Sequence, residues 1–191
     1  MSSNVLILHP QNAYQFYRTF ILQSNQKKAK IYKTYGFTMQ GSVSSKDWEV
    51  FAAILLNDRA NSTGGADLLH YEVKSAVIGG NFEYQYHRHQ GLTKLANDQA
   101  VDHIFVARNE AYTQIEVWLV PRVKLQSTFD RWLPELQQNY QTADRQRFRR
   151  SVTHSFVKNQ GILLLNITEG KLAYAPTSIE PMDSEYSQQS T

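Results

Sequence analysis

The chain contains no cysteine, and none of its apolar runs is long. Without cysteine it can form neither disulfides nor zinc–thiolate sites, and this composition is typical of proteins from a reducing compartment. No stretch approaches the roughly 18 apolar residues that a membrane-spanning helix needs. The first residues also lack the basic leader and apolar core of a secretory signal. We therefore expect a cytoplasmic protein that has no contact with a membrane.

The chain also lacks a strong excess of charge of either sign, since its formal net charge is +3 over 191 residues. So small an excess does not by itself establish a nucleic-acid partner. The length and a hydrophobic content of 41% suit one domain with a sizeable core. We expect that domain over residues 1–175. A flexible tail is expected over residues 176–191, where there is little apolar surface to bury.

Apolar periodicity predicts that helices and strands alternate along the chain. Ser44 or Ser45, followed by acidic residues and a dense apolar run, predicts the start of a buried helix. Helices are predicted over residues 12–24, 46–57, 82–96 and 127–158. Strands are predicted over residues 67–79, 103–108, 114–120 and 161–168, and residues 171–176 could pair with the last of them. This order predicts an α/β fold with a central mixed β-sheet flanked by helices.

The segment GGADLLHYEVKSAV, residues 64–77, combines three charged residues with a strand-like pattern. Residues two apart point to the same side of a strand, so Glu72 and Lys74 share a face, and His70 follows the same alternation. A carboxylate on that face can bind a hard divalent cation, and a lysine can orient a water or steady an anion. Asp67 is the nearest second carboxylate. Straight extension would separate it from Glu72 by roughly 16 Å, so the chain must bend between them.

An aspartate, a short spacer and Glu-x-Lys on a strand after a helix resemble the PD-(D/E)xK nuclease superfamily. The run YEVKSA is similar to the second motif strand of small type II restriction endonucleases. The resemblance implies a restriction-endonuclease-like fold in which Asp67 and Glu72 hold Mg²⁺ and Lys74 lies near the attacking water. Glu49, on the preceding helix, corresponds to an accessory acidic residue of some members.

The implied function is magnesium-dependent cleavage of double-stranded DNA by a sequence-specific enzyme that works as a homodimer. The chain departs from the family pattern in having Ala66 where proline is usual, and in a spacer of only four residues. Asp58 is therefore the alternative first carboxylate. Other functions stay open: a structure-specific repair or junction nuclease, and a non-catalytic nucleic-acid-binding protein in which Glu72 and Lys74 form a surface ion pair.

Basic residues elsewhere indicate where DNA would be contacted. Arginine binds both phosphates and guanine edges well, and lysine binds phosphates. The expected contacts lie on the predicted helix around residues 144–158 and in the segment after the motif; they are Arg145, Arg147, Arg149, Arg150, Arg88 and Lys94. A lysine- and tyrosine-rich run over residues 27–35 either binds backbone phosphates or forms a solvated face.

Overall fold

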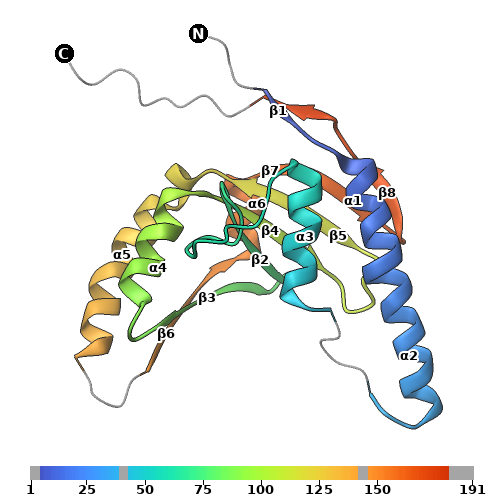
Figure 1. Ribbon diagram of the computed structural model, residues 1–191, viewed down its shortest axis with the longest axis horizontal. Coiled ribbons are helices and arrows are strands. Elements are labelled where there is room, and N and C mark those ends of the chain that lie inside the picture. Colours follow the sequence, from blue (N-terminus) through green and yellow to red (C-terminus); the bar gives the residue numbers. More distant parts are fainter. Residues whose placement is uncertain (1–4, 39–42, 142–145, 181–191) are drawn as a thin grey trace.

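A five-stranded mixed sheet lies at the centre of the computed structural model, which describes residues 5–38, 43–141 and 146–180 (Figure 1). Its strands, in spatial order, are β2 (Tyr71–Val77), β4 (Asp102–Arg108), β5 (Ile115–Val120), β7 (Ile162–Thr168) and β8 (Lys171–Tyr174). The first pair is parallel and the other three pairs are antiparallel. The predicted α/β class, with a mixed central sheet, is confirmed.

Helices cover both faces of this sheet (Figure 1). The helices of the described residues are α1 (Pro10–Phe16), the π-helix η1 (Tyr17–Gln23), α2 (Ser24–Thr34), α3 (Ser45–Leu56), α4 (Gly91–Ala100), α5 (Arg122–Tyr140) and α6 (His154–Gln160), of which α2 extends beyond the sheet (Figure 1). The central strand β4 is buried on both sides: Ile104 packs in one core with α1 and α3, and Phe105 packs in the other with α4 and α5. Such two-sided burial explains why β4 reads as a continuous apolar run.

Several predicted elements agree with the structure to within a few residues. The predicted buried helix is α3, and its N-cap is Ser44, whose hydroxyl accepts a hydrogen bond from the backbone nitrogen of Lys46 at 3.1 Å. The predicted strands correspond to β2, β4, β5 and β7, and β8 pairs with β7. Part of the expected tail forms β9 (Ser178–Ile179), which pairs with β1 (Leu6–Ile7), and residues 181–191 lie outside the described residues.

The helix predicted over residues 82–96 is wrong in its first half. Asn81–His87 form the strand β3, in which Phe82, Tyr84 and Tyr86 are buried and the residues between them are more exposed. This alternation has the period of two that belongs to a strand. Helix α4 begins only at Gly91.

The long helix predicted over residues 127–158 is also wrong. Helix α5 ends at Tyr140, and Arg147–Thr153 form the strand β6, antiparallel to β3. The two strands make a ribbon separate from the central sheet, here called the β3–β6 ribbon. Pro134 lies inside α5. Within the described residues, no helix is long and apolar enough to cross a membrane.

Candidate functional site

A cleft of about 470 Å³ opens between the first turn of α3, the strand β2 and the strand β3. Glu49 reaches it from α3, Lys74 from β2, and Asp67 from the loop before β2. The outer wall is formed by Glu83 and Gln85 of β3. The structure thus brings three predicted site residues to one cavity: Asp67, Lys74 and the accessory Glu49.

Asp67 reaches Glu72 because the chain bends between them, where the backbone nitrogen of Leu68 donates to the backbone oxygen of Tyr71 at 2.9 Å. The backbone nitrogen of Asp67 then donates to Oε2 of Glu72 at 3.1 Å. Just ahead of this bend, Gly64 and Gly65 have φ values of +87° and +103°, in the left-handed region that glycine adopts without strain. The bend that the sequence required is therefore present.

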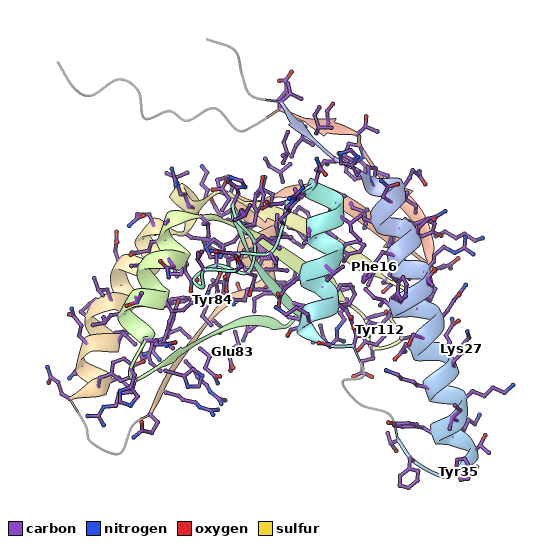
Figure 2. All side chains as sticks on the ribbon, in the orientation of Figure 1. Phe16, Lys27, Tyr35, Glu83, Tyr84 and Tyr112 are labelled. Carbon is purple, nitrogen blue, oxygen red and sulfur yellow. The ribbon has the colours of Figure 1, made fainter. Side chains whose placement is uncertain are left out.

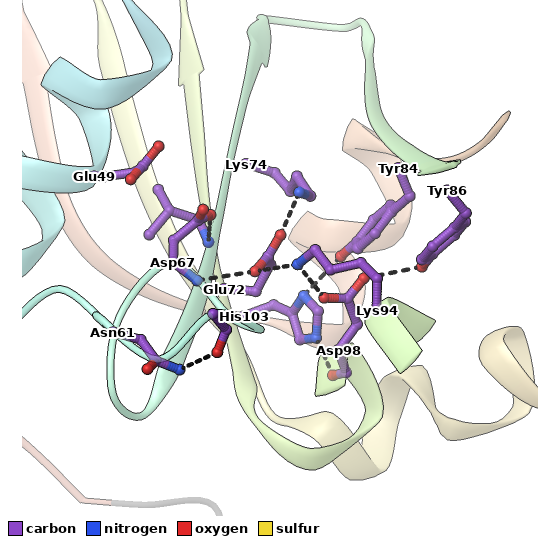
Figure 3. Close-up of polar contacts among 12 residues, drawn as sticks. Glu49, Asn61, Asp67, Glu72, Lys74, Tyr84, Tyr86, Lys94, Asp98 and His103 are labelled. Carbon is purple, nitrogen blue, oxygen red and sulfur yellow. Dashed lines mark hydrogen bonds and ion pairs between the residues drawn. The ribbon is translucent and has the colours of Figure 1, made fainter. Parts of the chain in front are cut away.

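Glu72 itself lies beneath the cleft and is only 1% exposed. Its Oε1 is 2.5 Å from Nζ of Lys74, and its Oε2 is 2.8 Å from Nζ of Lys94 (Figure 3). Burial alone would raise the pKa of Glu72, but Lys74 and Lys94 together hold that pKa below its ordinary value. Glu72 is therefore a buried, doubly paired carboxylate, and not the surface ion pair that one alternative required.

Asp67 and Glu49, two of the carboxyl groups that line the cleft, have raised pKa values, in contrast to Glu72. Burial raises the pKa of Asp67, and the nearby charge of Glu72 raises it further; Oδ2 of Asp67 accepts from the backbone nitrogen of Val73 at 3.1 Å. The pKa of Glu49 is raised by burial and by Asp67, although Glu49 is paired with Lys46. Two buried carboxylates in one cleft repel each other, and a bound cation would relieve that repulsion.

A network of polar side chains continues from Lys94 into the core. Nζ of Lys94 lies 2.6 Å from Oδ1 of Asp98, and the hydroxyl of Tyr86 donates to Oδ2 of Asp98 at 3.0 Å. Burial and the charge of Glu72 raise the pKa of Asp98 to about 6. Burial by itself would lower the pKa of Lys94, but Asp98 and Glu72 raise it.

His103 closes this network from the neighbouring strand β4. Its Nε2 lies 2.8 Å from the backbone oxygen of Asp98, and its Nδ1 lies 2.7 Å from the hydroxyl of Tyr84. A carbonyl oxygen can only accept, so Nε2 carries the proton and Nδ1 accepts from Tyr84. The centroid of the Tyr84 ring lies 4.9 Å from Nζ of Lys74. Because Lys74 lines the cleft, the network connects the core to the cleft.

Lys94, a predicted DNA contact, lies in this ion-pair network with 28% of its side chain exposed. Asp98, His103 and the two tyrosines of β3 were not predicted as site residues. One available signal was the spacing of Lys94 and Asp98, four residues apart on a helix, which is typical of an ion pair. No comparable signal marks His103, because its partners come from other elements.

Asp58 and His70, both candidate site residues, contact each other and are not among the residues that line the cleft. His70 has 75% of its side chain exposed, and its Nδ1 is 3.3 Å from Oδ1 of Asp58. Oδ2 of Asp58 accepts from the backbone nitrogen of His70 at 3.1 Å. Of the two candidate first carboxylates, the structure places Asp67, and not Asp58, beside Glu72.

The predicted DNA-contacting arginines lie on a strand instead of a helix. Arg147 and Arg149 are exposed on β6, whereas Nε of Arg150 donates to Glu135 at 2.6 Å. Arg88 follows β3, and its backbone nitrogen donates to the backbone oxygen of Gln146 at 2.9 Å. Arg145 lies outside the described residues.

No protein-family model matches the chain, and no curated protein matches it either. The chemistry of the site is therefore read from its own residues. Within the described ranges, no three histidine, aspartate or glutamate side chains are grouped so as to hold a metal ion. Besides Glu83 on its outer wall, the cleft offers two carboxylates, Glu49 and Asp67, next to the amine of Lys74, which Glu72 fixes in place.

Proposed function

We propose that the protein is a magnesium-dependent endonuclease of restriction-endonuclease-like fold that hydrolyses phosphodiester bonds of double-stranded DNA. A type II restriction enzyme is the role we favour. One observation carries the proposal: Asp67 and Lys74, both hydrogen-bonded to the buried Glu72, reach the same cleft as Glu49. Carboxylates beside an amine form the set that metal-assisted hydrolysis of a phosphate ester needs.

The residues of the cleft fit a hard cation, since their oxygens are the ligands that Mg²⁺ prefers, and the pKa values of Asp67 and Glu49 are raised by burial and by neighbouring carboxylates. Asp67 and Glu49 would hold the ion. Glu72, predicted as the second ligand, lies beneath the cleft with both oxygens paired to lysines, and it would act on the ion through Asp67 and Lys74. When bound, Mg²⁺ would activate a water and offset charge on the phosphate.

Lys74 has the position of a group that orients the attacking water. Its ammonium is held by Oε1 of Glu72 at 2.5 Å and lies over the ring of Tyr84, so two contacts restrict its rotamers. It can donate to a water or to a phosphate oxygen in the cleft while it keeps its hydrogen bond to Glu72. Glu72 therefore acts through Lys74 and through the backbone of Asp67 as a positioning residue.

Positive charge near the cleft supports a polyanionic substrate. Residues 1–46 contain no aspartate or glutamate, while α2 carries four exposed lysines: Lys27, Lys28, Lys30 and Lys33. Figure 1 shows α2 and the β3–β6 ribbon extending on either side of the first turn of α3, where the cleft lies. A duplex approaching the cleft would meet basic side chains on both sides. Cutting both of its strands would use two copies of the chain, which is why we propose a homodimer.

The decisive test is incubation of the purified protein with plasmid and linear DNA, in Mg²⁺ and in a chelator. We expect discrete fragments that require Mg²⁺, and a fall in rate of roughly 10²–10³-fold in Lys74→Ala, because an oriented donor is lost. Asp67→Asn should be at least as impaired. Lys171→Ala is the matched control, since Glu169 and Lys171 repeat the acid-x-Lys spacing in an exposed turn.

Each other outcome selects another function. Cutting confined to branched or mismatched DNA would favour a structure-specific nuclease over a restriction enzyme. Unchanged cutting in chelator, or by Asp67→Asn, would contradict the metal-dependent site. Binding of DNA without any cutting, equal in wild type and Lys74→Ala, would leave a non-catalytic nucleic-acid-binding protein.

A further inference from the structure

The β3–β6 ribbon has two unlike faces. One face carries the aromatic side chains of β3, which pack with α4 and α5 in the second core. The other carries Glu83, Gln85 and, across the register, Arg149. Figure 2 shows Tyr84 and Glu83 on opposite sides of β3. The polar face cannot be explained by packing, because its side chains are exposed or half-buried.

This polar face continues the wall of the cleft. Glu83 and Gln85 line the same cavity as Lys74 and Asp67. Arg149 lies directly opposite Gln85 in the ribbon. With its amide oxygen turned toward β6, Gln85 accepts from Nε and from one terminal nitrogen of Arg149, both at 2.9 Å. Glu83 lies farther off, 3.9 Å from the other terminal nitrogen.

Arg149 is therefore oriented without being buried, and its neighbour shows the contrast. The guanidinium of Arg150 points to Glu135 of α5, with Nε at 2.6 Å, and lies 4.3 Å from the ring of Phe148. Those contacts tie Arg150 to the body of the protein. Arg149 has 54% of its side chain exposed, and its weak pair with Glu83 leaves donors facing outward beside the cleft.

We infer that the β3–β6 ribbon enters the major groove of duplex DNA and that Arg149 reads a guanine there. The inference rests on the proposed function, because it places the ribbon on the substrate of the same cleft. A two-stranded ribbon fits the major groove, and arginine donates two hydrogen bonds to O6 and N7 of guanine. Gln85 holds the guanidinium plane in advance, which lowers the entropy cost of that contact.

Selection from a random duplex library tests the inference, with Ca²⁺ replacing Mg²⁺ so that bound duplexes are recovered uncut. The proteins are wild type, Arg149→Ala and Arg149→Lys, with Arg131→Ala of α5 as the matched control because Arg131 is exposed away from the ribbon. We expect wild type and the control to enrich one sequence. Both Arg149 variants should still enrich that sequence, but their discrimination at a single base pair should fall by between about 5-fold and about 150-fold. Lysine should not rescue, because it lacks the planar pair of donors.

Three results would overturn the inference. Arg149→Ala could enrich the wild-type sequence with unchanged preference at every position. It could bind all duplexes more weakly by one factor, which would make Arg149 a phosphate contact. Wild type could enrich no sequence at all. These failures are separate from failure of the proposed function, since Mg²⁺-dependent cutting that depends on Lys74 is measured without the library.

Discussion

Nζ of Lys94 lies 2.8 Å from Oε2 of Glu72, so a lysine from α4 neutralises the central carboxylate of β2 from the side opposite Lys74. The same ammonium lies 2.6 Å from Asp98. One cation thus joins two carboxylates that are each 1% exposed. Charges removed from water in this way are stable only while all partners are present.

Lys94→Met should therefore destabilise the fold as well as the site. The variant leaves Asp98 without a cation and Glu72 with only one, and we expect a loss of roughly 2–4 kcal/mol in the free energy of unfolding. Adding Asp98→Asn to Lys94→Met should recover part of that loss, because it removes an unpaired charge. Urea unfolding measures both changes. Lys124→Met, at an exposed position of α5, should stay within about 0.5 kcal/mol of wild type. If Lys94→Met matched it, the network would contribute nothing.

Magnesium should stabilise the protein through Asp67 and Glu49 in the cleft. At a concentration ten times its dissociation constant, the ion would add about 1.4 kcal/mol. Asp67→Asn should unfold at the same temperature as wild type or higher in chelator, because burial already disfavours the charged form. It should gain nothing from Mg²⁺. Thermal unfolding with and without the ion measures this, with Glu110→Gln as the exposed control. A full Mg²⁺ shift in Asp67→Asn would place the ion elsewhere.

The sequence predicted the core of the site better than its surroundings. Helix α3 and strand β2 have strong local signals, a capping serine and a run of β-branched and aromatic residues, and both were found. Residues 82–87 were predicted as helix because aromatic and polar residues satisfy either period over so short a run, and only the pairing with β6 decides for a strand. Lys94 was taken for a surface residue because its partner Glu72 comes from another element.

The lysines of α2 should contribute charge without sequence preference. Lys27, Lys30 and Lys33 follow one another at three-residue spacing on the helix, and none of them has an ion-pair partner among the described residues. Replacing all three by glutamine should weaken binding to every duplex and reduce the slope of log affinity against log salt by up to about 2.7, if each lysine contacts one phosphate. Fluorescence anisotropy over a salt series measures the slope.

A matched control for α2 removes equal charge from other exposed positions: Lys124, Lys158 and Lys171. If both triple variants lowered affinity and slope equally, the effect would be one of net charge, and α2 would have no special place on the duplex. A change in sequence preference in the α2 variant would also contradict the expectation, because phosphate contacts carry no sequence information.

His103 should make stability depend on pH in a defined direction. It is fully buried, and burial lowers its pKa from 6.5 to about 4. Between these two values the unfolded chain binds a proton that the folded chain does not. The contribution of His103 to the free energy of unfolding is therefore complete above pH 6.5. It declines as the pH falls toward 4, by roughly 3 kcal/mol in all.

Asp98 has the opposite effect on stability over part of the same pH range, because its pKa is raised in the folded state and its protonation therefore favours folding. Comparison of wild type with His103→Asn separates the contribution of His103 from that of Asp98. Urea unfolding from pH 4.5 to 7.5 should show wild type losing stability toward acid more steeply than His103→Asn, with the curves converging at low pH. His70→Asn, at an exposed histidine, should run parallel to wild type. If the curve of His103→Asn also ran parallel to that of wild type, His103 would take up its proton within the folded core. Its hydrogen bond to the backbone oxygen of Asp98 could then not fix the tautomer on which the contact with Tyr84 depends.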